Sequence, residues 1–354
     1  MVAKPAKRAD LQAEKPFLAV LRGERRDPVP MWMMRQAGRY LPEYRALRQE
    51  KGSFLDLVYD GDAAAEITLQ PLKRFPKLDA AILFSDILIV PFAIGQNLSF
   101  VAGEGPRLTP PLVSSDLDAL TPTLARFEPI YETVRKVKAR LSPQTALIGF
   151  AGSPWTVATY MIAGQGSRDQ SETRRLAYAD SKRFEGIIRR IEKVTFDYLV
   201  GQVEAGVEVL QLFDSWAGSL APSEFERWVI EPTARLVTRL RKLHPDIPII
   251  GFPKGAGGKI GAYARETDVD CVGLDETVDP AWANAQLPEG MAVQGNLDPL
   301  VLLAGGKELK VAAKRILDAF SDRPHIFNLG HGILQETPID HVSELVRLVK
   351  GKNA

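Results

Sequence analysis

Short apolar runs, each about the length of a β-strand, recur along the chain and constrain its fold more than any other feature. Most of these runs are continuous rather than alternating, which is typical of strands buried on both faces of a parallel sheet. The chain is therefore predicted to contain eight parallel strands. The runs occupy residues 28–34, 79–85, 145–151, 207–215, 247–253, 271–276, 292–297 and 325–330.

The segments between the runs have the spacing of amphipathic helices. Residues 306–320 and 338–350 combine an apolar stripe with late basic residues, which complement the helix dipole. Residues 174–203 are long enough for two helices. A further helix is predicted to open at Ser223, because Glu226 three residues later completes the pattern of a capping box.

Strands that alternate with helices predict an α/β fold, and eight such units fit a single (β/α)8 TIM-type barrel better than an open doubly wound sheet. No GxGxxG motif follows the first run, which weakens the dinucleotide-binding alternative. We expect a disordered tail at residues 1–14 and one catalytic barrel domain over residues 15–354. The insertion at residues 86–144 is expected to hold a small hairpin (96–108) and a helix (127–141).

Charge and cysteine content narrow the class of function. The formal net charge of +1 gives no global field for nucleic acid or an anionic membrane, so neither is an expected partner. The one cysteine, Cys271, permits no intrachain disulfide and suits a reducing compartment, so a cytoplasmic location is expected. Four histidines, no HxxxH pair and no second cysteine argue against a metal site.

Polar residues follow the apolar runs at the points where the strands are expected to end. In such a barrel the carboxyl ends of the strands meet at one mouth, where the active site lies. Segments far apart in the sequence thus bring polar groups to one rim, and this convergence favours a functional site. The residues are Arg35, Arg39, Asp86, Tyr160, Ser215, Lys254 and His331.

Two arginines behind the first run indicate the charge of the ligand. The guanidinium group presents a planar fork of donors that pairs with carboxylate in two-point fashion. Arg35 and Arg39 therefore suggest a substrate with several carboxylates or phosphates. Arg45, on the helix that follows, is instead expected to form surface ion pairs with Glu43 and Glu50.

Asp86 is the sharpest single signal, because it ends an apolar strand in the largely apolar context Phe-Ser-Asp-Ile-Leu-Ile-Val-Pro. A carboxylate in such a place is costly unless it is paired or matched to a bound cation or to N–H donors. The structural alternative is an ion pair with Arg35 or Arg39 that ties two loops together.

The remaining rim residues carry weaker signals. Glycines on both sides of His331 let the backbone approach a ligand closely and leave the imidazole as the only side chain there. The hydroxyl groups of Tyr160 and Ser215 could each satisfy a nearby backbone group instead. Asp214 is expected to point away from the mouth or to cap a helix. For Lys254 both an anion contact and a loop-ordering role stay open.

Several longer motifs together resemble the uroporphyrinogen decarboxylase family of haem biosynthesis. The resemblance runs in order from about Pro28 to Val349, and nearly every predicted strand contributes to it. RQAGRYLPE and NLGHG are the most specific of its segments. The motifs are MRQAGRYLPEYR (34–45), FSDIL (84–88), GFAGSPWT (149–156), TYM (159–161), QLFDSWAG (211–218), QGNLDP (294–299) and NLGHG (328–332).

The resemblance implies a homodimeric barrel that removes CO2 from the four acetate side chains of uroporphyrinogen III and yields coproporphyrinogen III. It implies no metal and no organic cofactor. Asp86 and Arg35 would be the catalytic residues. The substrate-binding residues would be Arg35, Gln36, Ala37, Gly38, Arg39, Asp86, Tyr160, Ser215 and His331.

The chemistry of the substrate agrees with this resemblance, since a pyrrole protonated at a ring carbon can take up the electron pair that decarboxylation releases. Asp86 would stabilise the resulting cation. The resemblance gives the proton-donor role to Arg35, while His331 or a water molecule is chemically easier. Two alternatives stay open: a zinc- and cobamide- or thiol-dependent methyltransferase on the same scaffold, and a non-catalytic tetrapyrrole carrier.

Overall fold

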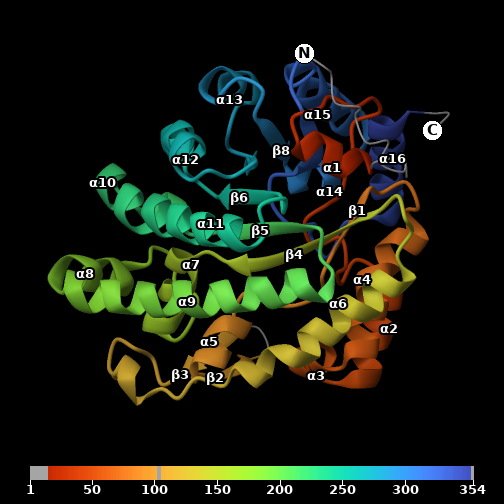
Figure 1. Cartoon of the computed structure of the whole chain (residues 1–354). Helices are drawn as coiled ribbons and strands as arrows, with labels where there is room; N and C mark the ends of the chain where they lie inside the picture. The colour runs from red at the N-terminus through yellow and green to blue at the C-terminus, as the bar shows by residue number, and fades with distance from the viewer. Residues whose placement is uncertain (1–14, 102–104, 352–354) are drawn as a thin grey trace, which may run out of the picture.

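Seven parallel strands form a curled sheet in the computed structural model, which describes residues 15–101 and 105–351 (Figure 1). The expected tail at residues 1–14 lies outside the described residues. Neighbouring strands follow one another in the order β1-β4-β5-β6-β7-β8-β9, so seven of the eight predicted strands are confirmed. Their bounds are β1 Ala80–Ile82, β4 Ala146–Gly152, β5 Val209–Asp214, β6 Ile249–Pro253, β7 Cys271–Gly273, β8 Ala292–Leu297 and β9 His325–Leu329.

The first predicted strand fills the gap between the two ends of this sheet. Met31 forms a parallel bridge with Phe327 of β9, and the Phe327 amide donates to the Pro30 carbonyl at 2.8 Å. On the other side, the Asp79 amide just before β1 donates to the Met31 carbonyl at 2.9 Å. The segment therefore closes the sheet into a barrel, as the eight apolar runs predict.

Helices cover the outside of the barrel (Figure 1). The helices predicted at residues 127–141, 306–320 and 338–350 are confirmed as α6, α15 and α16. The longer helices are α2 Pro42–Lys51, α4 Gly61–Arg74, α6 Glu128–Arg140, α7 Pro154–Ala163, α8 Ser171–Ala179, α9 Ser181–Ala205, α11 Glu231–Leu243, α15 Gly306–Ala319 and α16 Ile339–Lys350. The shorter ones are α1 Pro16–Leu21, α3 Phe54–Tyr59, α5 Ile89–Ile94, α10 Pro222–Phe225, α12 Ile260–Glu266, α13 Pro280–Gln286 and α14 Pro299–Ala304.

Residues 174–203 form two helices, as their length suggested. Asp180 leaves the helical conformation between α8 and α9, with φ −142°, and its side chain accepts the Arg183 amide at 3.0 Å. The expected hairpin in the insertion is also present, because β2 (Asn97–Val101) pairs antiparallel with β3 (Gly105–Thr109).

The predicted capping box at Ser223 and Glu226 is wrong. Helix α10 begins one residue earlier, at Pro222, and its N-cap residue Ala221 makes no side-chain cap. Proline suits the first helical position because its φ is fixed and the missing N–H would lack a helical partner there anyway. Ser223 therefore lies inside the first turn, where it cannot act as the N-cap.

The inside of the barrel is a second apolar core, separate from the layer between strands and helices. Ile148, Ile250 and Ile326 point inward, together with Trp32. The Trp32 indole donates to the Gln294 side chain at 2.8 Å, so the buried polar group of the tryptophan is satisfied within the barrel.

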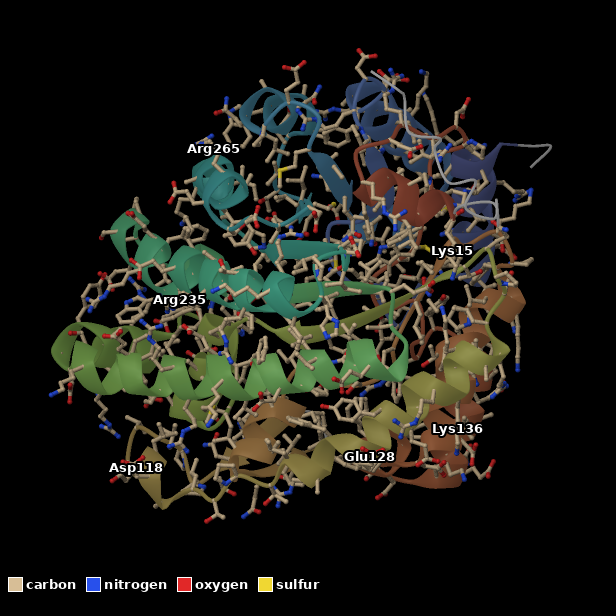
Figure 2. The ribbon with its side chains drawn as sticks, viewed as in Figure 1. Lys15, Asp118, Glu128, Lys136, Arg235 and Arg265 are labelled. Carbon is tan, nitrogen blue, oxygen red and sulfur yellow. The ribbon has the colours of Figure 1, made fainter. Side chains whose placement is uncertain are left out.

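Helix α1 closes the end of the barrel where the strands begin, which we call the floor. Phe17, Val20 and Leu21 pack against the first inward residues of several strands, and Cys271 of β7 is buried among them. Lys15, labelled in Figure 2, lies just before this helix. It anchors the helix, because its ammonium group donates to the Thr145 carbonyl and to the Glu208 carboxylate, both at 2.7 Å.

A second buried ion pair lies at the floor. The ammonium group of Lys350, at the end of α16, lies 2.8 Å from one carboxylate oxygen of Asp79. The same oxygen accepts the Met31 amide at 2.7 Å. The pair thus joins the first strand, the start of β1 and the final helix.

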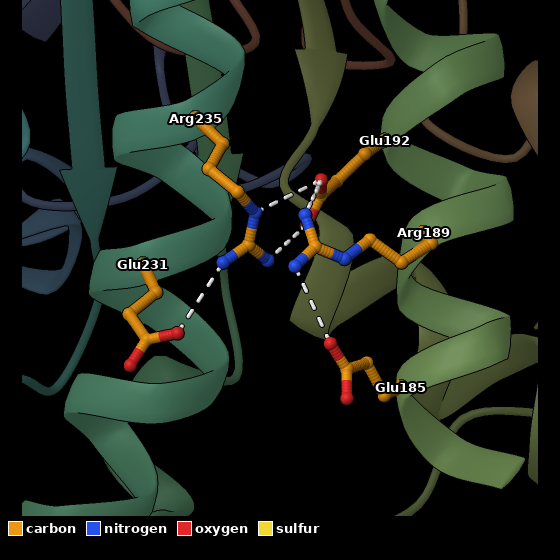
Figure 3. Close-up of polar contacts among 5 residues, drawn as sticks. All are labelled: Glu185, Arg189, Glu192, Glu231 and Arg235. Atoms are coloured by element: carbon orange, nitrogen blue, oxygen red, sulfur yellow. Dashed lines mark hydrogen bonds and ion pairs between the residues drawn. The ribbon is translucent and has the colours of Figure 1, made fainter. Parts of the chain in front are cut away.

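A charge network joins two outer helices, α9 and α11 (Figure 3). Glu192 of α9 is only 5% exposed, and it accepts hydrogen bonds from the Arg235 guanidinium of α11. Arg189 and Glu231 extend the network along each helix. In the described part of the chain, no helix combines the length and apolar character needed to cross a membrane.

Candidate active site

The residues singled out on the rim all lie at one end of the barrel, which we call the mouth. Each follows the carboxyl end of a strand, because the strands run parallel and their carboxyl ends share one face. The segments are the loop after Met34, the turn after β1, helix α7 after β4, and the loops after β5, β6 and β9.

Arg35 joins the first and last loops of the mouth. Its backbone has φ 59°, a left-handed conformation that is uncommon for residues other than glycine. A Cβ atom at Gly332 would come within 2.6 Å of Arg35 Cγ, so only glycine lets the arginine side chain pass there. A strained residue held by its surroundings is a mark of functional sites.

The other residues of the first loop divide into loop-holding and outward-facing groups. The Gln36 side chain is buried, where it accepts the Met33 amide at 3.1 Å and donates to the Ala80 carbonyl at 3.0 Å. Ala37 and Gly38 are half-buried. The Gln36 side chain therefore fixes the first loop against β1.

Arg39 is exposed and lines a basic groove of about 810 Å³ beside the mouth. Its guanidinium donates to Gln335 at 3.3 Å, which links the first loop to the segment after His331. The groove is lined by Arg39, Arg45, Arg48, Gln49, Gly52, Gln335 and Glu336.

The ion pairs expected for Arg45 are wrong. The Glu43 carboxylate is taken by Arg74 of α4, at 2.8 and 2.9 Å. Arg45 instead donates to the backbone carbonyls of Arg39, at 2.7 Å, and of Tyr40, at 3.1 Å. Helix-surface spacing could not reveal this, since the competing partners come from another helix and from the preceding loop.

Asp86 lies in the turn after β1, half-buried by its exposed area. Burial raises the pKa of its carboxyl to about 6, although the nearby Arg35 charge opposes the shift. One carboxylate oxygen accepts the Leu88 amide at 2.8 Å, which leaves the other oxygen without a hydrogen-bond partner among the described residues. The structure does not contain a direct ion pair of Asp86 with Arg35 or Arg39, because in its described part no guanidinium nitrogen of either arginine lies within 4.0 Å of the carboxylate.

The turn that carries Asp86 is held on both sides. The Phe84 amide donates to the Thr68 hydroxyl at 3.0 Å, and the Ser85 hydroxyl lies 3.2 Å from that of Tyr198 on α9. Sequence reasoning did not find Thr68 or Tyr198, because both act across long separations in the chain. Together they fix where the Asp86 carboxylate points.

Tyr160 of α7 lies near both Asp86 and Arg35. Burial raises the pKa of its hydroxyl, the Asp86 charge raises it further, and the Arg35 charge opposes the shift. The Tyr160 ring is 6.5 Å from that of Trp216, centroid to centroid. An aromatic wall therefore adjoins the carboxylate and the guanidinium.

Asp214, at the end of β5, points away from the mouth as expected, but it is fully buried. Its carboxylate accepts the Thr156 hydroxyl, and Thr156 in turn accepts the Trp216 amide at 3.0 Å. Burial raises the pKa of Asp214 to about 7. Ser215 lies between these two anchored residues and is half-buried at the rim.

His331 lies between cations at the far side of the mouth. Burial, together with the charges of Arg35 and Lys254, lowers the pKa of its imidazole to about 4, although the Asp275 charge opposes the shift. The ring is therefore neutral at pH 7. It can donate one hydrogen bond and accept another, but it holds no readily available acidic proton.

The arrangement combines a half-buried carboxylate, cationic groups and an aromatic wall at one mouth. Cys271 is buried at the floor, at the opposite end of the barrel, so it has no part in the mouth. Among the residues that the structure describes, no group of three or more His, Cys, Asp or Glu side chains is placed to hold a metal ion.

Comparison with solved structures identifies the scaffold. A methyltransferase from Methanosarcina mazei superimposes with a TM-score of 0.80, covering 96% of this chain and 98% of that chain. The two sequences are 18% identical, so the likeness concerns the fold alone.

Comparison of sequences gives the family. The family model for uroporphyrinogen decarboxylase (URO-D) matches residues 12–351. A uroporphyrinogen decarboxylase from Rhizorhabdus wittichii is 68% identical, covering 97% of this chain and all of that protein. One from Novosphingobium aromaticivorans is 63% identical, covering 95% of this chain and 98% of that protein. The chain thus belongs to the uroporphyrinogen decarboxylase family.

Proposed function

We propose that this protein is a carboxy-lyase that removes CO2 from the four acetate side chains of uroporphyrinogen III to give coproporphyrinogen III. The observation that carries the proposal is the Asp86 carboxylate, half-buried at the mouth beside the Arg35 charge. High identity to full-length relatives that bear this name supports the same conclusion.

Decarboxylation needs a place for the electron pair of the breaking C–C bond. A proton added to a pyrrole ring carbon next to the acetate group makes the ring a cation. The C–C bond then breaks, CO2 leaves, and its electron pair neutralises the ring as an exocyclic methylene forms. A second proton, added to that methylene, gives the methyl group as the ring carbon loses the first. The substrate itself is the electron sink, so the proposed reaction uses no metal or organic cofactor.

Asp86 faces the positive charge that develops in this sequence. Its free carboxylate oxygen can accept hydrogen bonds from the pyrrole N–H groups and stabilise the ring cation electrostatically. A single fixed group of this kind is worth about 3 kcal/mol in comparable sites. A pKa of about 6 still leaves Asp86 mostly ionised at pH 7, and the greater basicity makes its carboxylate a stronger hydrogen-bond acceptor.

The arginines would bind the carboxylates of the substrate. Uroporphyrinogen bears eight carboxylates, and a guanidinium can hold one through two parallel hydrogen bonds. Arg35 is set in the mouth itself, whereas Arg39 reaches the groove beside it. We assign further substrate contacts to Ala37, Gly38, Tyr160, Ser215 and His331, and a loop-holding role to Gln36.

The low pKa of His331 argues against it as the source of the proton, since little of the protonated form exists near neutral pH. Its neutral ring instead suits a hydrogen bond to the substrate. The proton then comes from Arg35 or from a water molecule at the mouth. A guanidinium group does not readily give up a proton in proteins, which favours water.

The same proposal includes a cytoplasmic homodimer in which residues 15–354 form one catalytic barrel. The family resemblance is its support. Sedimentation of the purified protein tests it: a mass twice the 39.0 kDa of the chain is expected.

Anaerobic incubation with uroporphyrinogen III tests the function directly. We expect release of four CO2 per substrate and a product with four carboxylates, counted by mass spectrometry. Binding without CO2 release would identify a tetrapyrrole carrier instead. Stoichiometric zinc, together with methyl transfer to a thiol, would identify the methyltransferase alternative.

A further inference from the structure

Lys254 is the one rim residue singled out from the sequence that the proposed function leaves without a role. It directly follows β6, and its backbone is locked in place. Its amide donates to the Asp214 carbonyl and its carbonyl accepts the Gly218 amide, both at 3.0 Å. A Cβ atom at Gly218 would come within 2.6 Å of the Gly255 carbonyl oxygen, so these two rim loops are in close contact.

The Lys254 side chain, unlike its backbone, is held by only one long contact. Its ammonium nitrogen lies 3.8 Å from Glu276, beyond hydrogen-bond distance, and the two side chains are 31% and 25% exposed. The ammonium group makes no hydrogen bond to any of the described residues. Floor lysines differ, because Lys15 and Lys350 each make ion pairs below 3 Å and also donate to a backbone carbonyl.

Glu276 is also incompletely satisfied. Its second carboxylate oxygen is buried without a hydrogen-bond partner in the part of the chain that is described. Glu276 packs against the loop of His331, since a Cβ atom at Gly330 would come within 2.6 Å of Glu276 Cα. A loosely held ion pair therefore stands at the rim next to the imidazole.

The positive charges of Lys254 and Arg35 both lie close enough to His331 to lower the pKa of its imidazole. The two cations come from different strands, β6 and the first strand, so they approach the mouth from separate segments of the rim. A ligand lying over His331 would meet positive charge from both.

We propose that Lys254 is a further substrate-binding residue, whose ammonium group exchanges the loose contact with Glu276 for a carboxylate of the tetrapyrrole. This inference rests on the proposed function and extends it to the β6 side of the mouth. Glu276 holds the cation while the site is empty and competes with the substrate for it. A lysine presents a mobile point charge, so it can follow one carboxylate as the macrocycle is repositioned between decarboxylations.

Two substitutions with opposite expected effects test this. Lys254→Gln should raise KM for uroporphyrinogen III about tenfold, the usual effect of losing one charged hydrogen bond, with a smaller change in kcat. Glu276→Gln should lower KM two- to fivefold, because it removes the competing anion. Lys254→Arg should restore most of the affinity lost in Lys254→Gln.

The pair Lys314 and Asp318 on α15 offers a matched control, since both side chains are exposed and lie 2.7 Å apart. Lys314→Gln and Asp318→Asn should leave KM unchanged. If Lys254→Gln lowers the melting temperature but not the affinity, or if Glu276→Gln raises KM as Lys254→Gln does, the pair is a structural tie and the inference is wrong. If Lys254→Gln does not fold, Glu276→Gln alone decides through the direction of its KM shift. A wild-type protein that releases no CO2 would overturn the proposed function itself. If the wild type is active but Lys254→Gln keeps its affinity, or Glu276→Gln raises KM, only the role of Lys254 is overturned.

Discussion

The floor and the mouth of the barrel are built from the same strands but handle charge in opposite ways. At the floor, α1 covers an apolar interior, and Lys15 and Lys350 are each held by short contacts to a carboxylate and a carbonyl. At the mouth, Asp86 and Lys254 keep unused hydrogen-bonding capacity among the described residues. The satisfied end serves stability, and the unsatisfied end is prepared for a polyanionic ligand. Four variants or conditions test this division.

The largest effect is expected at the floor. Phe17→Ala should lower the free energy of unfolding by about 3–5 kcal/mol, because it leaves a cavity where α1 closes the barrel. Denaturant titration measures the loss. Below the melting temperature, KM should match the wild type. Leu18→Ala, on the half-buried side of the same helix, should cost clearly less. Lost affinity in folded Phe17→Ala would show that the two ends are coupled.

At the mouth, Asp86→Asn should lower kcat at least about 100-fold, because the carboxylate that faces the ring cation becomes neutral. The melting temperature should stay equal or rise at pH 8. The sign follows from the raised pKa: above about pH 6 the ionised Asp86 destabilises the folded state, and the amide does not. Near wild-type turnover in this variant would remove Asp86 from the mechanism.

Arg35→Lys should lower kcat/KM about tenfold, since a lysine cannot reproduce two-point binding of a carboxylate. Partly decarboxylated intermediates with five to seven carboxylates should accumulate, which chromatography of the oxidised products detects. Arg140→Lys, which alters an exposed ion pair with Glu66, serves as the control and should release only the final product. An unchanged product distribution in Arg35→Lys would count against carboxylate binding by this residue.

The smallest effect concerns pH. The value of kcat/KM should be highest well above pH 6 and should fall as the pH drops through about 6. The reason is that Asp86 must be ionised to accept hydrogen bonds from the pyrrole N–H groups. At pH 5 the loss should be about tenfold. Asp214 also has a raised pKa, about 7, but its carboxylate is fully buried and accepts the Thr156 hydroxyl. The Asp214→Asn variant should therefore still lose kcat/KM as the pH falls through about 6. If this pH dependence disappears in the variant, Asp214 and not Asp86 is the titrating group.

Much of the barrel could be predicted from the sequence, because each strand carries its own signal. A run such as residues 146–151 has no polar side chain, and this composition at strand length is typical of a strand buried on both faces. The polar residues at the strand ends could be placed at one mouth because parallel strands share a direction. The family motifs then identified which of them are related to known site residues.

The predicted capping box at Ser223 failed for a local reason, because the proline before it takes the first position of the helix.

Contacts between distant segments were not predictable from local patterns either. The expected partners of Arg45 failed because Arg74, on another helix, takes Glu43. The supports of Asp86, such as Tyr198, have no local signal, since a hydroxyl pair across the fold leaves no periodicity in either segment.

Closure of the barrel ties together the most distant parts of the chain. Pro30 and Phe327 form the last seam, and Lys350 of the final helix reaches back to Asp79. During synthesis, the first strand can bond to Asp79 early, but its hydrogen bonds to Phe327 cannot form until β9 is made. The nascent chain therefore exposes an open sheet edge until almost all of it has left the ribosome. Long-range pairing of this kind slows folding and favours aggregation of the incomplete product. Ribosome-stalled chains that end before residue 325 should therefore depend on chaperones that cover the open edges at the first strand and at β8.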